Sequence, residues 1–298
     1  MDVRRERKNN LVGSGSDANT LKEAVLVTGA STGIGYAISV LLASEGYTVF
    51  AGVRNAADSA RLGQIAGVAP LQLDVTDAEQ IRDAAHIVHE SGQTLRGVVN
   101  NAGIAIPGPL EFLPVDELRR QFEVNFFGTI GVTQAFLPMQ RASKGRIVFI
   151  SSVSGQIASA FVGAYSSSKF ALEAAADVLR MELRGSGVGI SVVQTGNVDT
   201  PIWNKGRGQK DSLLARAPQV REYYEKHLNA LASLSQSQKA SGIDPVVVAR
   251  VVLHALTAKK PRARYAVGAP AGWMRRIFTA LPEHVRDRAL MRRMGFEE

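Results

Sequence analysis

From Ala24 onward, short apolar stretches rich in Val, Ile and Leu alternate with longer segments of helical periodicity. The short stretches predict seven strands, at residues 24–28, 47–53, 69–74, 97–100, 145–151, 189–195 and 264–267. The longer segments repeat apolar residues three and four positions apart and predict helices, among them 34–45, 78–90, 115–140 and 164–184. Because the strands are apolar at nearly every position, helices are expected on both faces of the sheet. The pattern predicts a single α/β domain built on a doubly wound parallel sheet of about seven strands.

Three segments depart from this alternation. Residues 1–20 are polar, include a Gly/Ser-rich stretch and predict a disordered basic tail that lacks the apolar region of a secretory signal. The domain is expected to span 21–268, with 269–298 as a basic helical extension of it. No apolar run approaches the roughly 20 residues that a membrane-spanning helix needs.

The third segment, 201–241, separates the last two predicted strands. It contains an amphipathic helix that begins near Pro218, with apolar side chains at Val220, Tyr224, Leu228, Leu231 and Leu234. We interpret the segment as a lid over an apolar substrate pocket, since small-molecule sites have mostly apolar walls. The alternative is a helix that packs against a partner subunit.

The net charge of +8 is concentrated at the two ends of the 298-residue chain. Residues 1–10 hold four basic and two acidic residues, residues 259–298 hold ten and four, and the stretch between them holds 21 of each. This distribution is unlike the basic stripe of a nucleic-acid groove, so no nucleic-acid partner is expected. The basic C-terminal helices favour peripheral contact with an anionic membrane surface; the alternative is a solvated arginine face on a packing helix.

The chain contains no cysteine, which excludes thiol catalysis, thiolate metal sites and disulfides, and fits a cytoplasmic location. The five histidines show no metal-ligand spacing, so no metal is expected.

The first predicted strand runs directly into TGASTGIG, residues 28–35, and then into a helical pattern. Glycines at 29, 33 and 35 allow a sharp turn and a close backbone approach to a pyrophosphate, which the helix N-terminus then faces. The residues expected to hold a dinucleotide are Gly29, Ser31, Thr32, Gly33, Ile34 and Gly35. The alternative is a tight turn without a ligand.

The end of the second strand, Phe50 to Arg54, carries no acidic residue to bind the ribose hydroxyls of NAD. Arg54, with the Ser31 hydroxyl, favours the 2′-phosphate of NADP over NAD. The alternative is that Arg54 is a solvated surface residue.

Tyr165 and Lys169 lie four positions apart in YSSSK and share one face of a predicted helix. A cation one turn away favours the tyrosine phenolate, which makes Tyr165 a candidate acid and base. Ser152 lies 13 residues before Tyr165, just past a strand, where its hydroxyl can hold a substrate oxygen.

These motifs resemble those of the short-chain dehydrogenase/reductase family, in its hydroxysteroid and retinol dehydrogenase branch. TGASTGIG is similar to the family's cofactor signature, NNAG at 100–103 to its motif after the fourth strand, and Ser152, Tyr165 and Lys169 to its catalytic set. The resemblance covers about residues 22–268 and implies a Rossmann-like fold.

The resemblance also implies roles for single residues. Tyr165 would exchange the proton, Lys169 would bind the nicotinamide ribose, Ser152 would orient the substrate and Asn125 would hold a water of a proton relay. Asp74 and Val75 would contact the adenine, while Asn101, Ala102 and Gly103 would line the cofactor cleft. For Asn125 the alternative is a buried residue that satisfies a neighbouring carbonyl, and for Asp74 a cap of the helix that begins near Thr76.

The segment after the sixth strand reads TGNVDT and lacks the proline usual in the family. Val198 and Thr200 are still expected to reach the nicotinamide carboxamide. The resemblance implies an oxidoreductase that uses NADP and an apolar steroid-, retinoid- or lipid-like alcohol or ketone, and that forms a homodimer or homotetramer through 162–183. The alternatives are a 3-oxoacyl-thioester reductase and an NADP-binding sensor without turnover.

Overall fold

The computed structural model describes residues 23–203, 219–227, 242–268, 277–294 and 296. Seven parallel strands form one sheet in the order β3-β2-β1-β4-β5-β6-β7. The strands are β1 (Ala24–Val27), β2 (Thr48–Val53), β3 (Val68–Gln72), β4 (Leu95–Asn100), β5 (Arg146–Ser152), β6 (Gly189–Thr195) and β7 (Arg264–Val267). The single Rossmann-like domain predicted from the hydrophobic pattern is confirmed.

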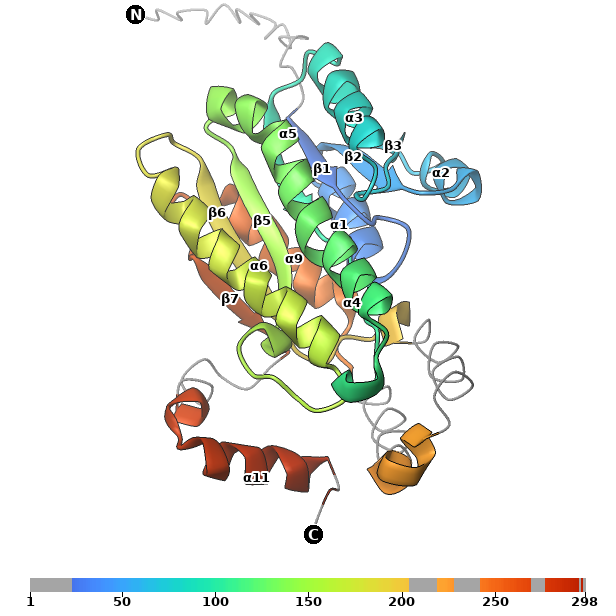
Figure 1. The fold of residues 1–298 in the computed structure, drawn as a ribbon. Coiled ribbons are helices and arrows are strands. Elements are labelled where there is room, and N and C mark those ends of the chain that lie inside the picture. The colour runs from blue at the N-terminus through green and yellow to red at the C-terminus, as the bar shows by residue number, and fades with distance from the viewer. Residues whose placement is uncertain (1–22, 204–218, 228–241, 269–276, 295, 297–298) are drawn as a thin grey trace, which may run out of the picture.

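Helices cover both faces of this sheet, with α3, α5 and α6 on one face and α1 and α9 on the other (Figure 1). The helices are α1 (Gly33–Ser44), α2 (Ala56–Leu62), α3 (Ala78–Glu90), α4 (Val115–Phe122), α5 (Gly128–Ser143), α6 (Gly163–Glu182), α9 (Pro245–Thr257) and α11 (Glu283–Arg293). Two of them, α2 and α9, lie outside the segments expected from the hydrophobic pattern. A π-helical turn at Glu123–Phe127 joins α4 to α5, so the expected helix 115–140 is one continuous path with a wider turn inside it.

Side-chain caps fix where several helices begin. Asp77 accepts hydrogen bonds from the backbone N–H groups of Glu79 and Gln80 at the start of α3. Asp244 caps α9 in the same way, and a proline follows it at the first helical position. Each cap satisfies a backbone donor that the helix itself leaves without an acceptor.

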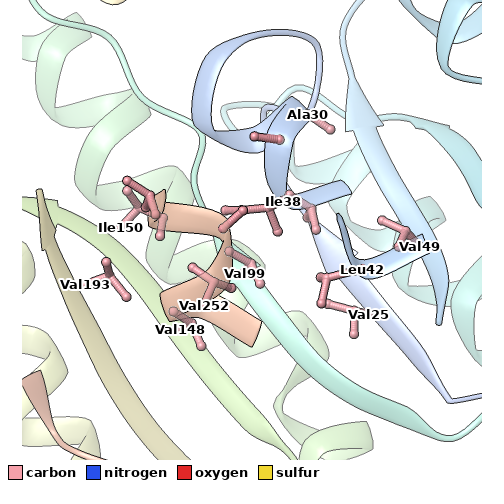
Figure 2. Close-up of a cluster of buried hydrophobic side chains, with 14 of the residues drawn as sticks. Val25, Ala30, Ile38, Leu42, Val49, Val99, Val148, Ile150, Val193 and Val252 are labelled. Atoms are coloured by element: carbon pink, nitrogen blue, oxygen red, sulfur yellow. The ribbon is translucent and has the colours of Figure 1, made fainter. Parts of the chain in front are cut away.

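The largest core cluster lies between the sheet and the helix pair α1 and α9. Figure 2 shows Val25, Val99, Val148 and Val193 from four neighbouring strands facing helix residues that include Ile38. All five are fully buried. This packing holds the first turn of α1 close to the ends of β1 and β4, where the glycine loop lies.

Several predictions fall on residues outside the described ranges. These are the tail 1–20, most of the lid segment and the start of the C-terminal extension. Two parts of the lid are described: a 3-10 turn at Pro201–Trp203 and residues 219–227, which are helical as expected. Within the described ranges, no helix combines the length and apolar character needed to cross a bilayer.

Candidate active site

The glycine loop lies between β1 and α1 and is held in contact with two other segments. Gly29 and Gly33 have φ angles of 62° and 56°, in the left-handed region that glycine adopts at little cost. A Cβ on Gly29 would lie 2.8 Å from the Ala102 Cα, and one on Gly33 would lie 3.0 Å from the Thr200 Cγ2. The structure therefore brings together three predicted cofactor segments: the glycine loop, the NNAG motif and the segment that ends at Thr200.

Asn101 fastens this loop to the end of β4. Its side-chain amide donates hydrogen bonds to the carbonyl oxygens of Thr28, at 2.9 Å, and Gly29, at 3.0 Å. In return, the Thr28 hydroxyl accepts from the backbone N–H groups of Asn101 and Ala102, both at 3.0 Å. These four bonds make the loop and the NNAG motif one rigid unit.

The N-terminus of α1 fits a bound pyrophosphate. Thr32 is the N-cap residue and makes no side-chain capping bond, and the first turn carries no acidic residue. The amide groups and the positive end of the helix dipole are thus left available within the described part of the chain. This arrangement fits the phosphates of a dinucleotide, with Ser31, Thr32 and Ile34 at their edge.

Two arginines lie near the loop, although the sequence pattern indicated only one. Arg54 follows β2, is 59% exposed at its side chain and lies 3.9 Å from an Asp74 oxygen. Arg61, in α2, donates to the Ser31 carbonyl oxygen at 2.5 Å and lies 5.3 Å from the centre of the Tyr36 ring. Sequence reasoning missed Arg61 because its approach to the loop depends on the placement of α2.

Asp74 forms a local turn after β3. One of its oxygens accepts from the Thr76 N–H at 3.0 Å and from the Thr76 hydroxyl at 2.8 Å. The residue that caps the following helix is Asp77, so capping by Asp74, the alternative left open by the sequence, is wrong. The next residue, Val75, is buried, and a Cβ on Gly128 would press against its carbonyl group.

Ser152 ends β5, and its side chain is hydrogen-bonded to that of Tyr165 on α6. Its hydroxyl also accepts from the Ser154 N–H at 3.1 Å. Burial raises the pKa of Tyr165 above that of a free tyrosine, and the bond with Ser152 opposes this. Desolvation therefore outweighs the lowering that the sequence suggested, and a phenolate at neutral pH needs further positive charge nearby.

Lys169 lies one turn farther along α6, with its ammonium 5.8 Å from the centre of the Tyr165 ring. The ammonium donates to the Ile150 carbonyl oxygen of β5 at 2.8 Å. Burial lowers the pKa of Lys169 to about 8, and the nearby Glu173 acts in the opposite direction. The predicted set of Ser152, Tyr165 and Lys169 thus converges at the carboxyl end of β5.

Asn125 is fully buried in the π-helical turn. Its side chain bonds the backbone of Ile104 twice, accepting from the N–H at 2.9 Å and donating to the carbonyl at 3.0 Å, and donates to the Ser168 hydroxyl at 3.1 Å. Asn125 therefore has the structural role that the sequence left open, that of a buried side chain that satisfies a neighbouring carbonyl. Its bonds tie the segment after β4 to α6. The water-holding role stays a prediction.

An aromatic cluster forms around Phe161, four residues before Tyr165 in the chain, and was not expected from the sequence. Phe161, at a φ of 63°, is 5.4 Å from the ring of Tyr224, 5.9 Å from that of His227 and 5.4 Å from that of Phe296. Tyr224 also donates its hydroxyl to Glu111 at 2.8 Å. The described part of the lid and the C-terminal end therefore meet over the segment that precedes the candidate catalytic helix.

The contact between Val198 and a nicotinamide stays a prediction, and the structure gives the Val198 backbone a defined place. Val198 forms a bridge with Ile243, and the Asp199 N–H donates to the Ile243 carbonyl at 3.0 Å. Among the described residues, no group of three or more His, Asp or Glu side chains is arranged to hold a metal ion.

Comparison with known proteins gives consistent matches over most of the chain. A family model described as short chain dehydrogenase matches residues 23–211. The 3-amino-tetrahydro-pyrrolizinone reductase of Xenorhabdus hominickii is 39% identical over 83% of this chain and 87% of that protein. The mitochondrial D-beta-hydroxybutyrate dehydrogenase of Bos taurus is 35% identical over 89% of this chain and 83% of that protein. The estradiol 17-beta-dehydrogenase 2 of Rattus norvegicus is 37% identical over 86% of this chain and 71% of that protein.

Solved structures share the same fold. A short-chain dehydrogenase from Streptomyces avermitilis superimposes with a TM-score of 0.70 at 26% identity, covering 93% of this chain and 97% of that one. A Burkholderia cenocepacia short-chain dehydrogenase in complex with NADP superimposes with a TM-score of 0.69 at 24% identity, covering 92% of this chain and 97% of that one.

Proposed function

Since the chain belongs to the short-chain dehydrogenase family and is an NAD(P)-dependent oxidoreductase of CH–OH groups, we propose that it transfers a hydride between NADP(H) and an apolar alcohol or ketone. The observation that carries this proposal is the convergence of Ser152, Tyr165 and Lys169 at the carboxyl end of β5, the same edge of the parallel sheet at which the glycine loop follows β1. When bound, the nicotinamide cofactor supplies or accepts the hydride.

The protein's own residues position the substrate and move the proton. Ser152, already bonded to Tyr165, orients the substrate oxygen beside the phenol. Tyr165 donates a proton to that oxygen in reduction and removes one in oxidation. Lys169 provides the positive charge that stabilises the phenolate and binds the ribose, while Asn125 keeps the surrounding segments in place.

The preference for NADP rests on the charge around the Ser31 loop. Arg54 directly follows β2, Arg61 of α2 donates to the Ser31 carbonyl, and β2 itself ends without an acid. A 2′-phosphate carries about two negative charges and is bound best by guanidinium groups. The remaining proposed cofactor contacts are Asp74, Val75, Asn101, Ala102, Gly103, Val198 and Thr200.

The substrate class rests on the lid segment and on the relatives. Tyr224 and His227 of the lid helix pack their rings against Phe161, just before the helix that carries Tyr165, and aromatic walls of this kind would suit a ring-bearing or otherwise apolar substrate. One relative is named for estradiol and another for hydroxybutyrate, so both a steroid-like alcohol and a short hydroxy acid belong in the screen.

The test is NADPH oxidation with a panel of steroid ketones, retinal, short 3-oxoacids and acyl-thioesters, with Tyr165→Phe as control. Turnover of the apolar ketones by the wild type alone supports the proposal. Turnover confined to acyl-thioesters would make the protein a 3-oxoacyl-thioester reductase. Tight NADPH binding without turnover of any compound would favour the sensor.

We also propose a homo-oligomer that forms through α6 and the π-helical turn before α5. Apolar side chains are exposed at Phe170, Val178 and Met181 of α6 and at Phe127 of that turn. Exposed large apolar side chains are typical of subunit contacts. Analytical ultracentrifugation of wild type and Met181→Lys tests it, and equal masses would contradict it.

The C-terminal helix α11 is proposed to make peripheral contact with an anionic membrane from the cytoplasm. Its arginines Arg288 and Arg292 are exposed and Arg286 is half-buried, while Val285 and Met291 are exposed apolar side chains. Co-sedimentation with anionic vesicles, compared between the full chain and a chain that ends at Gly268, tests this. Equal sedimentation of the two would remove the membrane contact.

A further inference from the structure

Four polar residues follow one another at intervals of four along α6: Tyr165, Lys169, Glu173 and Asp177. This spacing places them in one row on the helix surface. Lys169 and Glu173 are each only 5% exposed, whereas the Asp177 side chain is 38% exposed. The row therefore runs from the buried candidate active site toward the surface, and only its first two members belong to the predicted catalytic set.

Glu173 is held in a fixed orientation from two strands. One carboxylate oxygen accepts from the Gln194 amide of β6 at 2.8 Å, and the other accepts from the Arg264 Nε of β7 at 3.0 Å. The two terminal nitrogens of Arg264 donate to Asp177 at 3.0 and 2.7 Å. A buried carboxylate is tolerated when its oxygens are bonded and a cation compensates its charge, and both conditions are met here.

Lys169 needs such a partner. Its ammonium is buried, and the hydrogen bond that it donates to Ile150 goes to an uncharged carbonyl. The end of β5 that Lys169 contacts through the Ile150 carbonyl consists of Ile150, Ser151 and Ser152, none of which carries a charge. Among the described residues, Tyr165 and Glu173 on α6 are the ionisable groups next to it in the row, and Arg264 of β7 stands behind Glu173.

We propose that Glu173 is a positioning residue for proton transfer, whose carboxylate keeps the Lys169 ammonium charged beside Tyr165 while Gln194 and Arg264 hold the carboxylate in place. The inference rests on the proposed roles of Tyr165 and Lys169. Without Glu173, burial alone would act on Lys169, and its positive charge would be lost at a lower pH. Tyr165 would then lack the cation that favours its phenolate.

The test compares Glu173→Gln with the wild type in NADP+-dependent oxidation of the best alcohol from the screen, from about pH 6 to about pH 10. We expect the alkaline fall of kcat to move to lower pH by about one unit in Glu173→Gln. Glu173→Asp, which keeps the charge, should retain the wild-type profile. Asp177→Asn, which disturbs Arg264 at the far end of the row, should lower stability and leave the profile unchanged.

A second readout needs no turnover. The free energy of unfolding of the cofactor-free protein, measured in urea over the same pH range, should begin its alkaline rise about one unit lower in Glu173→Gln than in the wild type. If Glu173→Gln does not fold, Arg264→Gln replaces it. Removal of that cation strengthens the effect of Glu173 on Lys169 and should move the alkaline fall of kcat to higher pH.

Failure of this inference differs from failure of the proposed function. An inactive wild type, or an active Tyr165→Phe, would remove the proposed catalysis. An active, Tyr165-dependent enzyme whose pH profiles are the same in wild type and in a folded Glu173→Gln would overturn the role of Glu173 alone. A shift of the same size in Asp177→Asn would also overturn it, because general loosening of the helix would then be the cause.

Discussion

The Lys169 ammonium lies 5.8 Å from the centre of the Tyr165 ring, and both side chains are almost entirely buried. Burial acts on the two groups in opposite ways: it raises the pKa of the phenol and lowers the pKa of the amine. Both changes favour the uncharged forms, whereas the proposed chemistry needs the phenolate and the ammonium. The charged forms that the proposed reaction needs are therefore the ones that are costly to the fold.

Removal of the Tyr165 hydroxyl should abolish turnover. Tyr165→Phe is expected to lower kcat by at least about a thousandfold, since no other group of the set can exchange the proton. The Kd for NADPH, measured by fluorescence titration, should stay within about twofold of the wild type because the ring remains in place. Retained activity would show that another residue is the acid.

Replacement of Lys169 should stabilise the cofactor-free protein at neutral pH. Its pKa is about 8 when folded and 10.5 when unfolded, so between these values the unfolded chain binds more protons and stability rises with pH. Below about pH 8 the wild type bears the full cost of a buried charge, which Lys169→Met removes. Urea unfolding at pH 7 should show a gain of up to about 3 kcal/mol, reduced by the lost bond to Ile150.

The pH dependence of that gain distinguishes the charge from simple packing. The difference between Lys169→Met and the wild type should shrink as pH rises from about 8 to about 10.5. A difference that does not change with pH would mean that the added apolar surface, and not the lost charge, stabilises the variant. Activity should be lost in either case, as expected where stability and function compete.

A methyl group at Gly35 should disrupt cofactor binding. The Cβ of Gly35→Ala would collide with the Gly29 carbonyl oxygen and the Asn101 side-chain amide, both of which belong to the loop unit. We expect the Kd for NADPH to rise at least about tenfold. The matched control is Gly131→Ala in α5, where the new Cβ would meet only the Ile81 Cδ1 at 3.4 Å and helix propensity would favour alanine. Equal Kd values for the two variants would contradict the loop geometry.

Cofactor preference should depend on Arg54 and Arg61. Arg54→Ala and Arg61→Ala are each expected to raise the Kd for NADPH by about tenfold. The Kd for NADH should change by less than about twofold. Isothermal titration with both cofactors measures the ratio. The control is Arg119→Ala, which removes an exposed cation from α4 that pairs only locally with Asp116. If both loop variants keep the wild-type ratio, the assignment of NADP fails.

The aromatic cluster should govern substrate affinity more than the chemical step. Phe296 packs against His227 with ring centres 4.3 Å apart, and against Phe161, and it is outside the candidate catalytic set. Phe296→Ala should raise KM for an apolar ketone at least about fivefold and leave kcat within about twofold. Val285→Ala, at an exposed position of α11, is the matched control and should change neither constant.

The strands and the catalytic set were predictable because each depends on local pattern. Strands buried on both faces are apolar throughout, and Tyr165 and Lys169 share a helix, so their proximity follows from spacing alone. Arg61, Glu173 and Phe296 were not predictable as site residues, since each owes its place to a partner distant in sequence. Glu173 is bonded to Arg264, which is 91 residues away in the sequence, and Arg61 is bonded to Ser31, which is 30 residues away. The π-helical turn at Asn125 was not predictable either, because the apolar spacing is typical of an α-helix both before and after it.

The position of β1 between β2 and β4 has a consequence for how the protein folds and how long it stays folded. Thr28 hydrogen-bonds to Val99, 71 residues later, and Asn101 completes the same seam. Contacts of such separation form late because their loop must close first. The dinucleotide site is thus assembled only when the central seam closes, and it is lost as soon as the seam opens. A cofactor that binds both sides of this seam would stabilise the folded state, so resistance to unfolding should rise with the cofactor concentration.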